Sequence, residues 1–269
     1  HILGSASIEV QVEGQRLLFS GDIGPGGQPL EGQPRGPRGL DLLVMEGTYG
    51  DRERPQLDAE ARREVLRQEV ATALARGGNL VIPAFAVERT QELLADLASL
   101  FDSHALRPVP VFIDSPLALR ATQVFLEHMA ELPRAIKTAH LQRANFHATE
   151  TVDESKAIAR MARGAIIVAG SGMCDGGRVR HHLKNNLWRP ESTVLLVGFQ
   201  ATGTLGQVLL SGTGAVRIHG EEVAVRAAIR SIDVYSGHAD RSQLIAWARA
   251  RLAATDAAHV LLTHGEPQA

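Results

Sequence analysis

Helix-like and strand-like segments alternate between residues 57 and 197, and this alternation restricts the possible folds more than any other feature of the sequence. The helix-like segments are 57–76, 88–100, 118–129 and 177–186, and the strand-like runs are 79–83, 109–113, 165–169 and 193–197. Strands that are apolar throughout and alternate with helices are typical of a parallel sheet that helices cover on both faces. We therefore predict an α/β fold with such a sheet in this region.

The flanking segments have a different pattern. Residues 6–22 alternate and turn like a β-hairpin, and a Gly/Pro-rich loop at 24–39 leads to an apolar strand at 40–45. After residue 205 the predicted elements are strands at 216–219, 222–225 and 230–234, a helix at 242–253 and a strand at 259–263. The chain thus returns to short strands after the α/β region.

Composition narrows the class of protein. The chain has 269 residues, of which 44% are hydrophobic and 22% charged, as in a soluble globular protein with a sizeable core. Its single cysteine, Cys174, excludes an internal disulfide and fits a reducing compartment, so we predict a cytoplasmic protein. No apolar run approaches the roughly 18 residues of a membrane span. A net charge of -2 gives no global positive field, so nucleic acid would need a local site.

Five polar residues follow predicted strands or neighbour glycine and serine: His1, Asp22, Glu46, His238 and His264. Singly, each has a simpler explanation, because Asp before Gly favours a turn and His at a strand end serves as a hydrogen-bond partner. Together, imidazole and carboxylate form the ligand set that suits zinc or manganese. The residues alone therefore indicate a metal site without deciding it.

A glycine-rich segment, 171–184, is the second candidate site. It follows a predicted strand and precedes a predicted helix, where backbone N–H groups commonly bind phosphate, and Arg178, Arg180 and Lys184 add positive charge. The alternative is a turn followed by a solvated basic helix face. We expect His181 and His182 at the surface.

Two further features have open interpretations. Arg89 contacts RNA or forms a salt bridge to the helix that carries Glu92. The segment 114–116 is a functional loop or a helix-capping turn, since Asp and Ser satisfy helix N-termini directly.

The phrases around these residues resemble a known family. They are His1-Ile2-Leu3-Gly4-Ser5-Ala6, Phe19-Ser20-Gly21-Asp22-Ile23-Gly24, Glu46-Gly47-Thr48-Tyr49-Gly50-Asp51, Tyr235-Ser236-Gly237-His238-Ala239-Asp240 and Leu262-Thr263-His264-Gly265-Glu266. In this order they resemble the metallo-β-lactamase fold nucleases of the β-CASP family. The phrases at 82–89, 114–118, 169–173 and 176–178 resemble its bacterial branch.

The resemblance implies a role for each of these residues. His1 corresponds to a ligand of one zinc, Asp22 to the aspartate that bridges both zincs, and His264 to a ligand of the second. His238 corresponds to the histidine that protonates the leaving oxygen, and Glu46 to the acidic residue that supports it. In the glycine-rich segment, the resemblance favours an RNA phosphate contact for Ser171, Gly172 and Arg178.

The resemblance also implies an architecture and an activity. The fold would be a metallo-β-lactamase αββα sandwich, residues 1–56 and 205–269, with a β-CASP domain inserted at 57–204. The intact protein would be a zinc-dependent ribonuclease that cuts single-stranded RNA with two Zn²⁺ ions, with Mn²⁺ as a substitute and a homodimer as one assembly known among relatives. A histidine at 264 favours RNA over DNA by analogy. The alternatives are a DNA nuclease, a hydrolase of small esters and a catalytically inactive RNA-binding or scaffold subunit.

The sequence lacks one motif of the family. The phrase His-x-His-x-Asp-His occurs nowhere in these residues, so the metal ligands that it supplies are missing. We expect the chain to be a fragment of a longer protein, and to be inactive or nearly so by itself.

Overall fold

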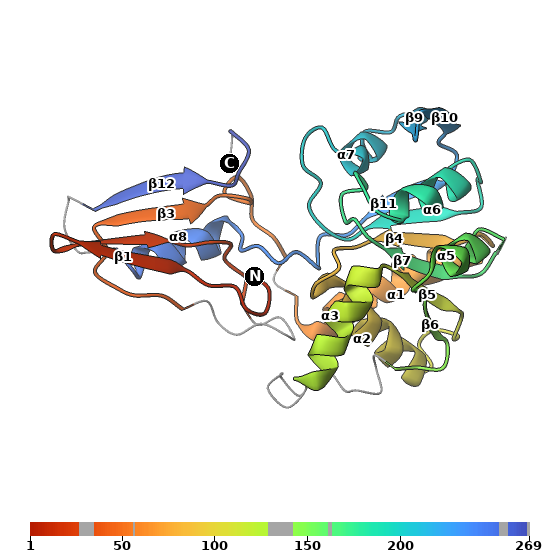
Figure 1. Ribbon diagram of the computed structural model, residues 1–269, viewed down its shortest axis with the longest axis horizontal. Helices are drawn as coiled ribbons and strands as arrows, with labels where there is room; N and C mark the ends of the chain where they lie inside the picture. The colour runs from red at the N-terminus through yellow and green to blue at the C-terminus, as the bar shows by residue number, and fades with distance from the viewer. Residues whose placement is uncertain (27–34, 56, 129–141, 161–162, 253–257, 268–269) are drawn as a thin grey trace. The chain divides into compact units, whose positions relative to one another are not determined.

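The computed structural model describes residues 1–26, 35–55, 57–128, 142–160, 163–252 and 258–267 (Figure 1). The predicted loop at 24–39 lies partly outside these residues. The chain forms two compact units, one of residues 1–56 and 236–269 and the other of residues 57–235. No helix in the described ranges is both long enough and apolar enough to cross a membrane.

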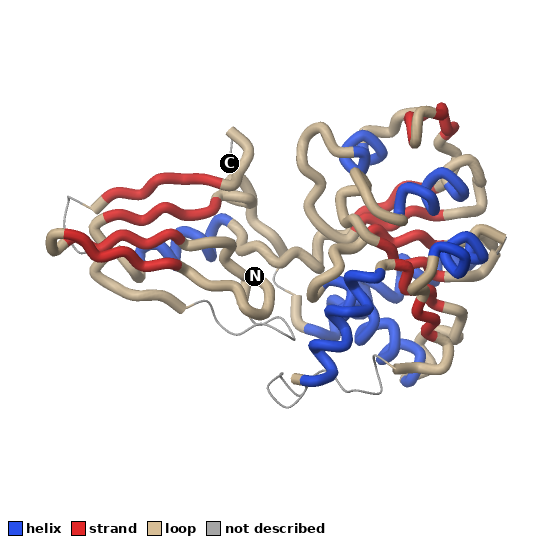
Figure 2. Tube along the Cα trace, in the orientation of Figure 1, coloured by secondary structure: helices blue, strands red, loops and turns tan. Residues whose placement is uncertain are grey.

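The first unit contains a sheet with the strand order β1-β2-β3-β12 among its described residues. Its elements are β1 (Ile8–Val12), β2 (Gln15–Phe19), β3 (Leu42–Glu46), α8 (Arg241–Arg249) and β12 (His259–Thr263). The first pair is antiparallel and is joined by the two-residue turn Glu13–Gly14, in which both residues have positive φ, as in a type I′ turn. The pairs β2–β3 and β3–β12 are parallel. The four strands lie side by side in the sheet (Figure 2).

The core of this unit lies between the sheet and α8. Leu18 and Leu43 from the sheet cluster with Leu244 and Trp247 from the helix. Asp240 begins the helix with a capping box, in which its carboxylate accepts from the Gln243 N–H. The cap fixes the chain directly after His238.

The second unit is built on a sheet in which every described strand pair is parallel, in the order β11-β8-β4-β7-β5-β6. The strands are β4 (Leu80–Pro83), β5 (Val111–Asp114), β6 (Phe146–Ala148), β7 (Ile166–Ala169), β8 (Thr193–Leu196) and β11 (Ala228–Ser231). The other elements are α1 (Ala59–Ala75), α2 (Arg89–Asp102), α3 (Pro116–Glu127), α5 (Val152–Ile158), α6 (Val179–Asn186), α7 (Leu205–Leu210) and the hairpin of β9 (Ala215–Ile218) and β10 (Glu221–Ala224).

Both faces of this sheet are covered. Val81 and Ile167 join Val179 and Leu183 of α6 in one core cluster. The alternate residue Leu80, whose side chain points to the opposite face, is also fully buried. The predicted α/β fold with a covered parallel sheet is confirmed.

The compact unit and the predicted insert end at different residues, and the predicted domain boundary stays a prediction. The predicted insert ended at residue 204, whereas the compact unit ends at Tyr235. The cause is β11, which pairs in parallel with β8 and so adds an edge strand to the inserted sheet. The predicted strand at 230–234 corresponds to β11, and β6, α5 and α7 were not predicted.

A buried ion pair lies next to both chain connections of the second unit. Arg62, in the first turns of α1, donates to both carboxylate oxygens of Asp96 at 2.8 and 3.1 Å. Tyr235, the last residue of the unit, donates its hydroxyl to Asp96 at 2.7 Å. All three side chains are buried, so the carboxylate depends on these donors for its stability.

We expect Arg62→Met to lower the free energy of unfolding by about 3 kcal/mol, because it removes both guanidinium hydrogen bonds to a buried carboxylate and leaves only the Arg63 guanidinium, 3.9 Å away, as a cation. Arg67→Met is the matched control on the same helix, since Arg67 pairs with Glu64 at the surface and should cost less than about 0.5 kcal/mol. Urea unfolding of the two variants measures the difference. Equal losses would contradict the prediction.

Candidate metal centre

Asp22 lies just beyond β2, where a tight turn directs its side chain. Gly21 has a φ of +59°, and a Cβ at this position would lie 2.9 Å from the carbonyl oxygen of Ala6. Only glycine combines this conformation with this close approach. The turn therefore fixes where the Asp22 carboxylate points.

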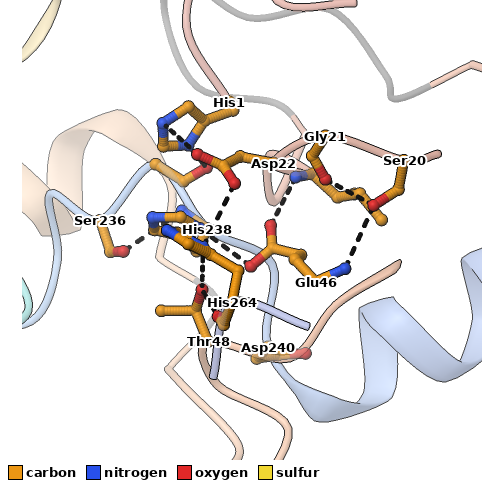
Figure 3. Close-up of polar contacts among 12 residues, drawn as sticks. His1, Ser20, Gly21, Asp22, Glu46, Thr48, Ser236, His238, Asp240 and His264 are labelled. Atoms are coloured by element: carbon orange, nitrogen blue, oxygen red, sulfur yellow. Dashed lines mark hydrogen bonds and ion pairs between the residues drawn. The ribbon is translucent and has the colours of Figure 1, made fainter. Parts of the chain in front are cut away.

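The two carboxylate oxygens of Asp22 face different histidines (Figure 3). Oδ2 lies 3.3 Å from Nε2 of His1, and Oδ1 lies 3.3 Å from Nδ1 of His264. A carboxylate with one oxygen toward each of two imidazoles has the geometry that can bridge two metal ions.

Each of these histidines has further contacts. Nδ1 of His1 lies 3.0 Å from the carbonyl oxygen of Gly237. The Thr48 hydroxyl donates to the carbonyl oxygen of His264 at 3.0 Å and lies 3.2 Å from its Nδ1. His264 itself has a φ of +52°. Parallel pairing of β3 with β12 aligns Glu46 with Thr263, which brings the residues after both strands to one edge of the sheet.

His238 and Glu46 form a hydrogen-bonded pair at the same edge. Nδ1 of His238 lies 2.9 Å from Oε2 of Glu46, whose side chain is almost fully buried. The other oxygen of Glu46 accepts from the Ile23 N–H, and the Glu46 N–H donates to the Ser20 hydroxyl. A carboxylate only accepts, so the proton of the pair lies on Nδ1 of His238.

This environment keeps Glu46 ionised. Burial alone would raise the pKa of its carboxyl, because it disfavours the charged form. The hydrogen bond and charge of His238 act against burial, and the contacts from Thr48 and the Ile23 N–H add to them. The net result is a pKa below the ordinary value of 4.5.

His238 is held in position by three residues that we did not predict, which are Ser236, Arg54 and Tyr49. Its N–H donates to the Ser236 hydroxyl at 3.2 Å, and Arg54 donates to its carbonyl oxygen at 3.0 Å. The Tyr49 ring meets the His238 ring edge-on at 6.3 Å, and the Arg54 guanidinium lies over the Tyr49 ring at 5.0 Å. Ser236 and Tyr49 stand in the phrases that suggested the site, which is the signal that could have identified them.

The side chains are close enough to share metal ions. His1, Asp22 and His238 form one group, and Glu46, His238 and His264 form another, with the ligand atoms of each group within 4.8 Å of one another. Imidazole nitrogen and carboxylate oxygen are the donors that zinc and manganese accept. All five predicted site residues of this unit therefore come together, and their donor set fits such an ion.

The predicted RNA-binding residues lie in the second unit, in the segment between β7 and α6. The Arg178 guanidinium is held within the unit, because it donates to Asp114 at 2.7 Å and to the carbonyl oxygens of Thr149 and Glu150 at 3.0 and 2.8 Å. Ser171 accepts from the Gly176 N–H, and Gly172 is buried. An RNA contact of these three residues stays a prediction.

His182 is not at the surface, contrary to our expectation. Its side chain is 2% exposed, and its Nε2 lies 2.6 Å from Asp114, which also accepts from the Ser155 hydroxyl at 2.6 Å. His182 belongs to the buried face of α6 with Val179 and Leu183. The spacing of these residues is that of one helical face, which was the missed signal.

The structure shows the contacts of the two features whose interpretation was open, Arg89 and the segment 114–116. Arg89 pairs with Glu92 within α2. Ser115 caps α3 by accepting from the Ala118 N–H at 3.2 Å, so the segment 114–116 includes a capping turn.

Asp114 supports a prediction about pH. Burial raises its pKa, but hydrogen bonds from His182, Ser155 and Arg178 outweigh burial and lower the pKa from 3.8 to about 2. The carboxylate therefore stabilises the fold above pH 3.8, and this contribution is lost as the pH falls toward 2. We expect Asp114→Asn to cost about 2 kcal/mol at neutral pH and progressively less as the pH falls below 4.

Urea unfolding at neutral and acidic pH measures this effect. Asp153→Asn is the control, since the Asp153 side chain is 96% exposed and should change stability little at either pH. A loss for Asp114→Asn that stays the same across the acidic range would contradict the prediction.

Comparison with known families gives two matches, one within the second unit and one that runs from the end of the second unit through the C-terminal part of the first. The Beta-Casp domain matches residues 90–209, and the Zn-dependent metallo-hydrolase RNA specificity domain matches residues 222–269. The chain belongs to the β-CASP family. The resemblance seen in the sequence is confirmed, as is the metallo-β-lactamase/β-CASP fold. The match to the Zn-dependent metallo-hydrolase RNA specificity domain indicates that this β-CASP protein depends on a metal.

Curated β-CASP relatives are similar along most of the chain. Ribonuclease TTHA0252 of Thermus thermophilus is 36% identical over 100% of this chain and 61% of its own length. An RNase J-like protein of Methanocaldococcus jannaschii is 34% identical over 91% of this chain and 58% of its own length. Transcription termination factor FttA of Pyrococcus abyssi is 31% identical over 100% of this chain and 43% of its own length. The chain thus spans between two fifths and three fifths of the length of these relatives.

Proposed function

We propose that the full-length protein is a metal-dependent ribonuclease that hydrolyses phosphodiester bonds of single-stranded RNA. The observation that carries this proposal is the Asp22 carboxylate, with one oxygen toward His1 and the other toward His264. This arrangement is suited to two cations that share one carboxylate. A two-cation site is suited to displacement at phosphorus.

His1 and Asp22 would hold one zinc ion, and Asp22 and His264 the other, with manganese as a substitute. When bound, such a pair of ions activates water and neutralises charge on the phosphate. The missing ligands would come from the His-x-His-x-Asp-His motif of the full-length protein. The 269 residues alone would therefore bind zinc weakly.

His238 would donate a proton to the departing oxygen. Glu46 accepts the Nδ1–H of this ring, so the donated proton would come from Nε2 of the doubly protonated ring. Glu46 acts through His238 and is a positioning residue in this scheme.

Two findings support RNA over DNA as the substrate. The C-terminal match is to an RNA specificity domain, and two of the relatives are named as ribonucleases. A role in RNA processing or degradation follows from this activity. Cytoplasmic location and a homodimer stay predictions.

Cleavage assays with the full-length protein test the proposal. End-labelled single-stranded RNA and DNA of one sequence, with a small ester in parallel, are incubated with zinc or manganese and again after chelation. We expect metal-dependent cleavage of RNA only. Preferential cleavage of DNA would indicate a DNA nuclease, and no cleavage by protein with both metals bound would favour the ester hydrolase or the scaffold.

A further inference from the structure

An exposed aromatic ring lies beside the loop predicted to contact RNA. Phe85 follows β4 in the segment that leads to α2, and it is 45% exposed. Strands β4 and β7 are parallel neighbours, and their last residues, Pro83 and Ala169, are register partners (Figure 1). Phe85 and the loop at 171–172 thus follow the carboxyl ends of adjacent strands, where open α/β sheets bind ligands.

The backbone that carries the ring is fixed. The Ala84 N–H donates to the carbonyl oxygen of Ala169 at 3.0 Å. The carbonyl oxygen of Phe85 accepts from the Thr90 hydroxyl at 2.8 Å and from the Thr90 N–H at 3.3 Å. An exposed ring on a fixed backbone loses little conformational entropy when a ligand covers it.

The ring lies against a glycine. A Cβ on Gly172 would lie 2.8 Å from both Cδ2 and Cε2 of Phe85, so any larger residue would displace the ring. The carbonyl oxygen of Gly172 is held in turn by the Gln200 amide at 3.1 Å. The exposed Phe85 ring therefore lies directly over the buried Gly172 peptide, which fixes the ring against the loop predicted to contact RNA.

We propose that Phe85 stacks on a base of the bound single-stranded RNA. This inference rests on the proposed function and adds to it a substrate feature, an unpaired base. The exposed ring lies at the carboxyl ends of the strands, beside the loop predicted to contact RNA, and every base offers a face for stacking on such a ring. Bases inside a duplex are already stacked, so the contact selects single strands without reading sequence.

Binding measurements on the full-length protein test the stacking contact. The Asp22→Asn variant, which prevents cleavage, serves as the parent, and fluorescence anisotropy gives Kd for a short labelled RNA. We expect Phe85→Leu to raise Kd about 5- to 100-fold and Phe85→Trp to keep it near the parent value. A series of oligonucleotides with one abasic nucleotide at each position should weaken binding to the parent at one position and leave Phe85→Leu unchanged there.

Trp188→Leu is the matched control. Trp188 is an aromatic residue of the same unit with 50% exposure, but it lies between α6 and β8, at the opposite end of the sheet strands. We expect its Kd to stay within about twofold of the parent. An equal loss in Trp188→Leu would show a general effect of exposed aromatics and overturn the inference.

The two proposals fail in different ways. If Phe85→Leu binds every oligonucleotide like the parent while the wild type still cleaves RNA, the stacking inference is wrong and the ribonuclease proposal stands. If the wild type neither binds nor cleaves RNA, both are wrong.

Discussion

Asp22→Asn in the full-length protein is expected to lower RNA cleavage more than 100-fold and to reduce the amount of bound zinc. Changes to the partners of metal ligands typically cost about 10- to 100-fold, and loss of a ligand should cost more. The amide keeps the shape of the carboxylate but offers only one oxygen, so it could not be a ligand to one cation beside His1 and to another beside His264. Its NH₂ group would point toward one of the cations.

The measurement combines metal analysis with cleavage rates. Asp153→Asn makes the same chemical change on an exposed side chain of the second unit, and it should retain both metal content and rate. Circular dichroism checks that both variants fold. If Asp22→Asn retains two zinc ions and cleaves RNA within about threefold of the wild type, Asp22 does not bridge metals.

The alternating strands and helices of the second unit were predictable because their signal is local. Each strand from β4 to β8, except β6, consists mainly of apolar residues, and each predicted helix is at least eight residues long. The elements that we missed are β6, α5 and α7, with three, seven and six residues. Such short elements are stabilised by the sheet around them and leave little periodicity in the sequence.

The end of the second unit was not predictable from local pattern. The short strand β11 gives no sign in the sequence of which sheet it joins. Its position depends on pairing with β8, more than thirty residues earlier in the chain. Pairing of this kind is decided by the folded structure as a whole.

The candidate metal centre was predictable because its residues follow strands of one sheet. Glu46 and His264 end or follow β3 and β12, which pair in parallel, and Asp22 follows β2. The contacts that position these residues were less predictable. Arg54 reaches the His238 carbonyl oxygen across 184 residues of sequence, and no spacing rule connects the two.

Glu46→Gln should reduce kcat for RNA cleavage about 100- to 10,000-fold while leaving KM nearly unchanged. The reason lies in the two contacts of the side chain. One oxygen must accept from the Ile23 N–H, so in glutamine the remaining NH₂ group faces Nδ1 of His238. That nitrogen must then accept, so His238 loses the carboxylate contact that stabilises its doubly protonated ring, which is the form that donates a proton from Nε2.

Histidine ¹⁵N spectra distinguish this effect from a loss of structure. The wild type should show His238 with its proton on Nδ1, and Glu46→Gln should show the proton on Nε2 in a protein that remains folded. Glu53→Gln makes the same change on an exposed glutamate of the first unit and should alter neither the tautomer nor kcat. If Glu46→Gln keeps kcat within about threefold although the tautomer has changed, Glu46 does not support proton transfer by His238.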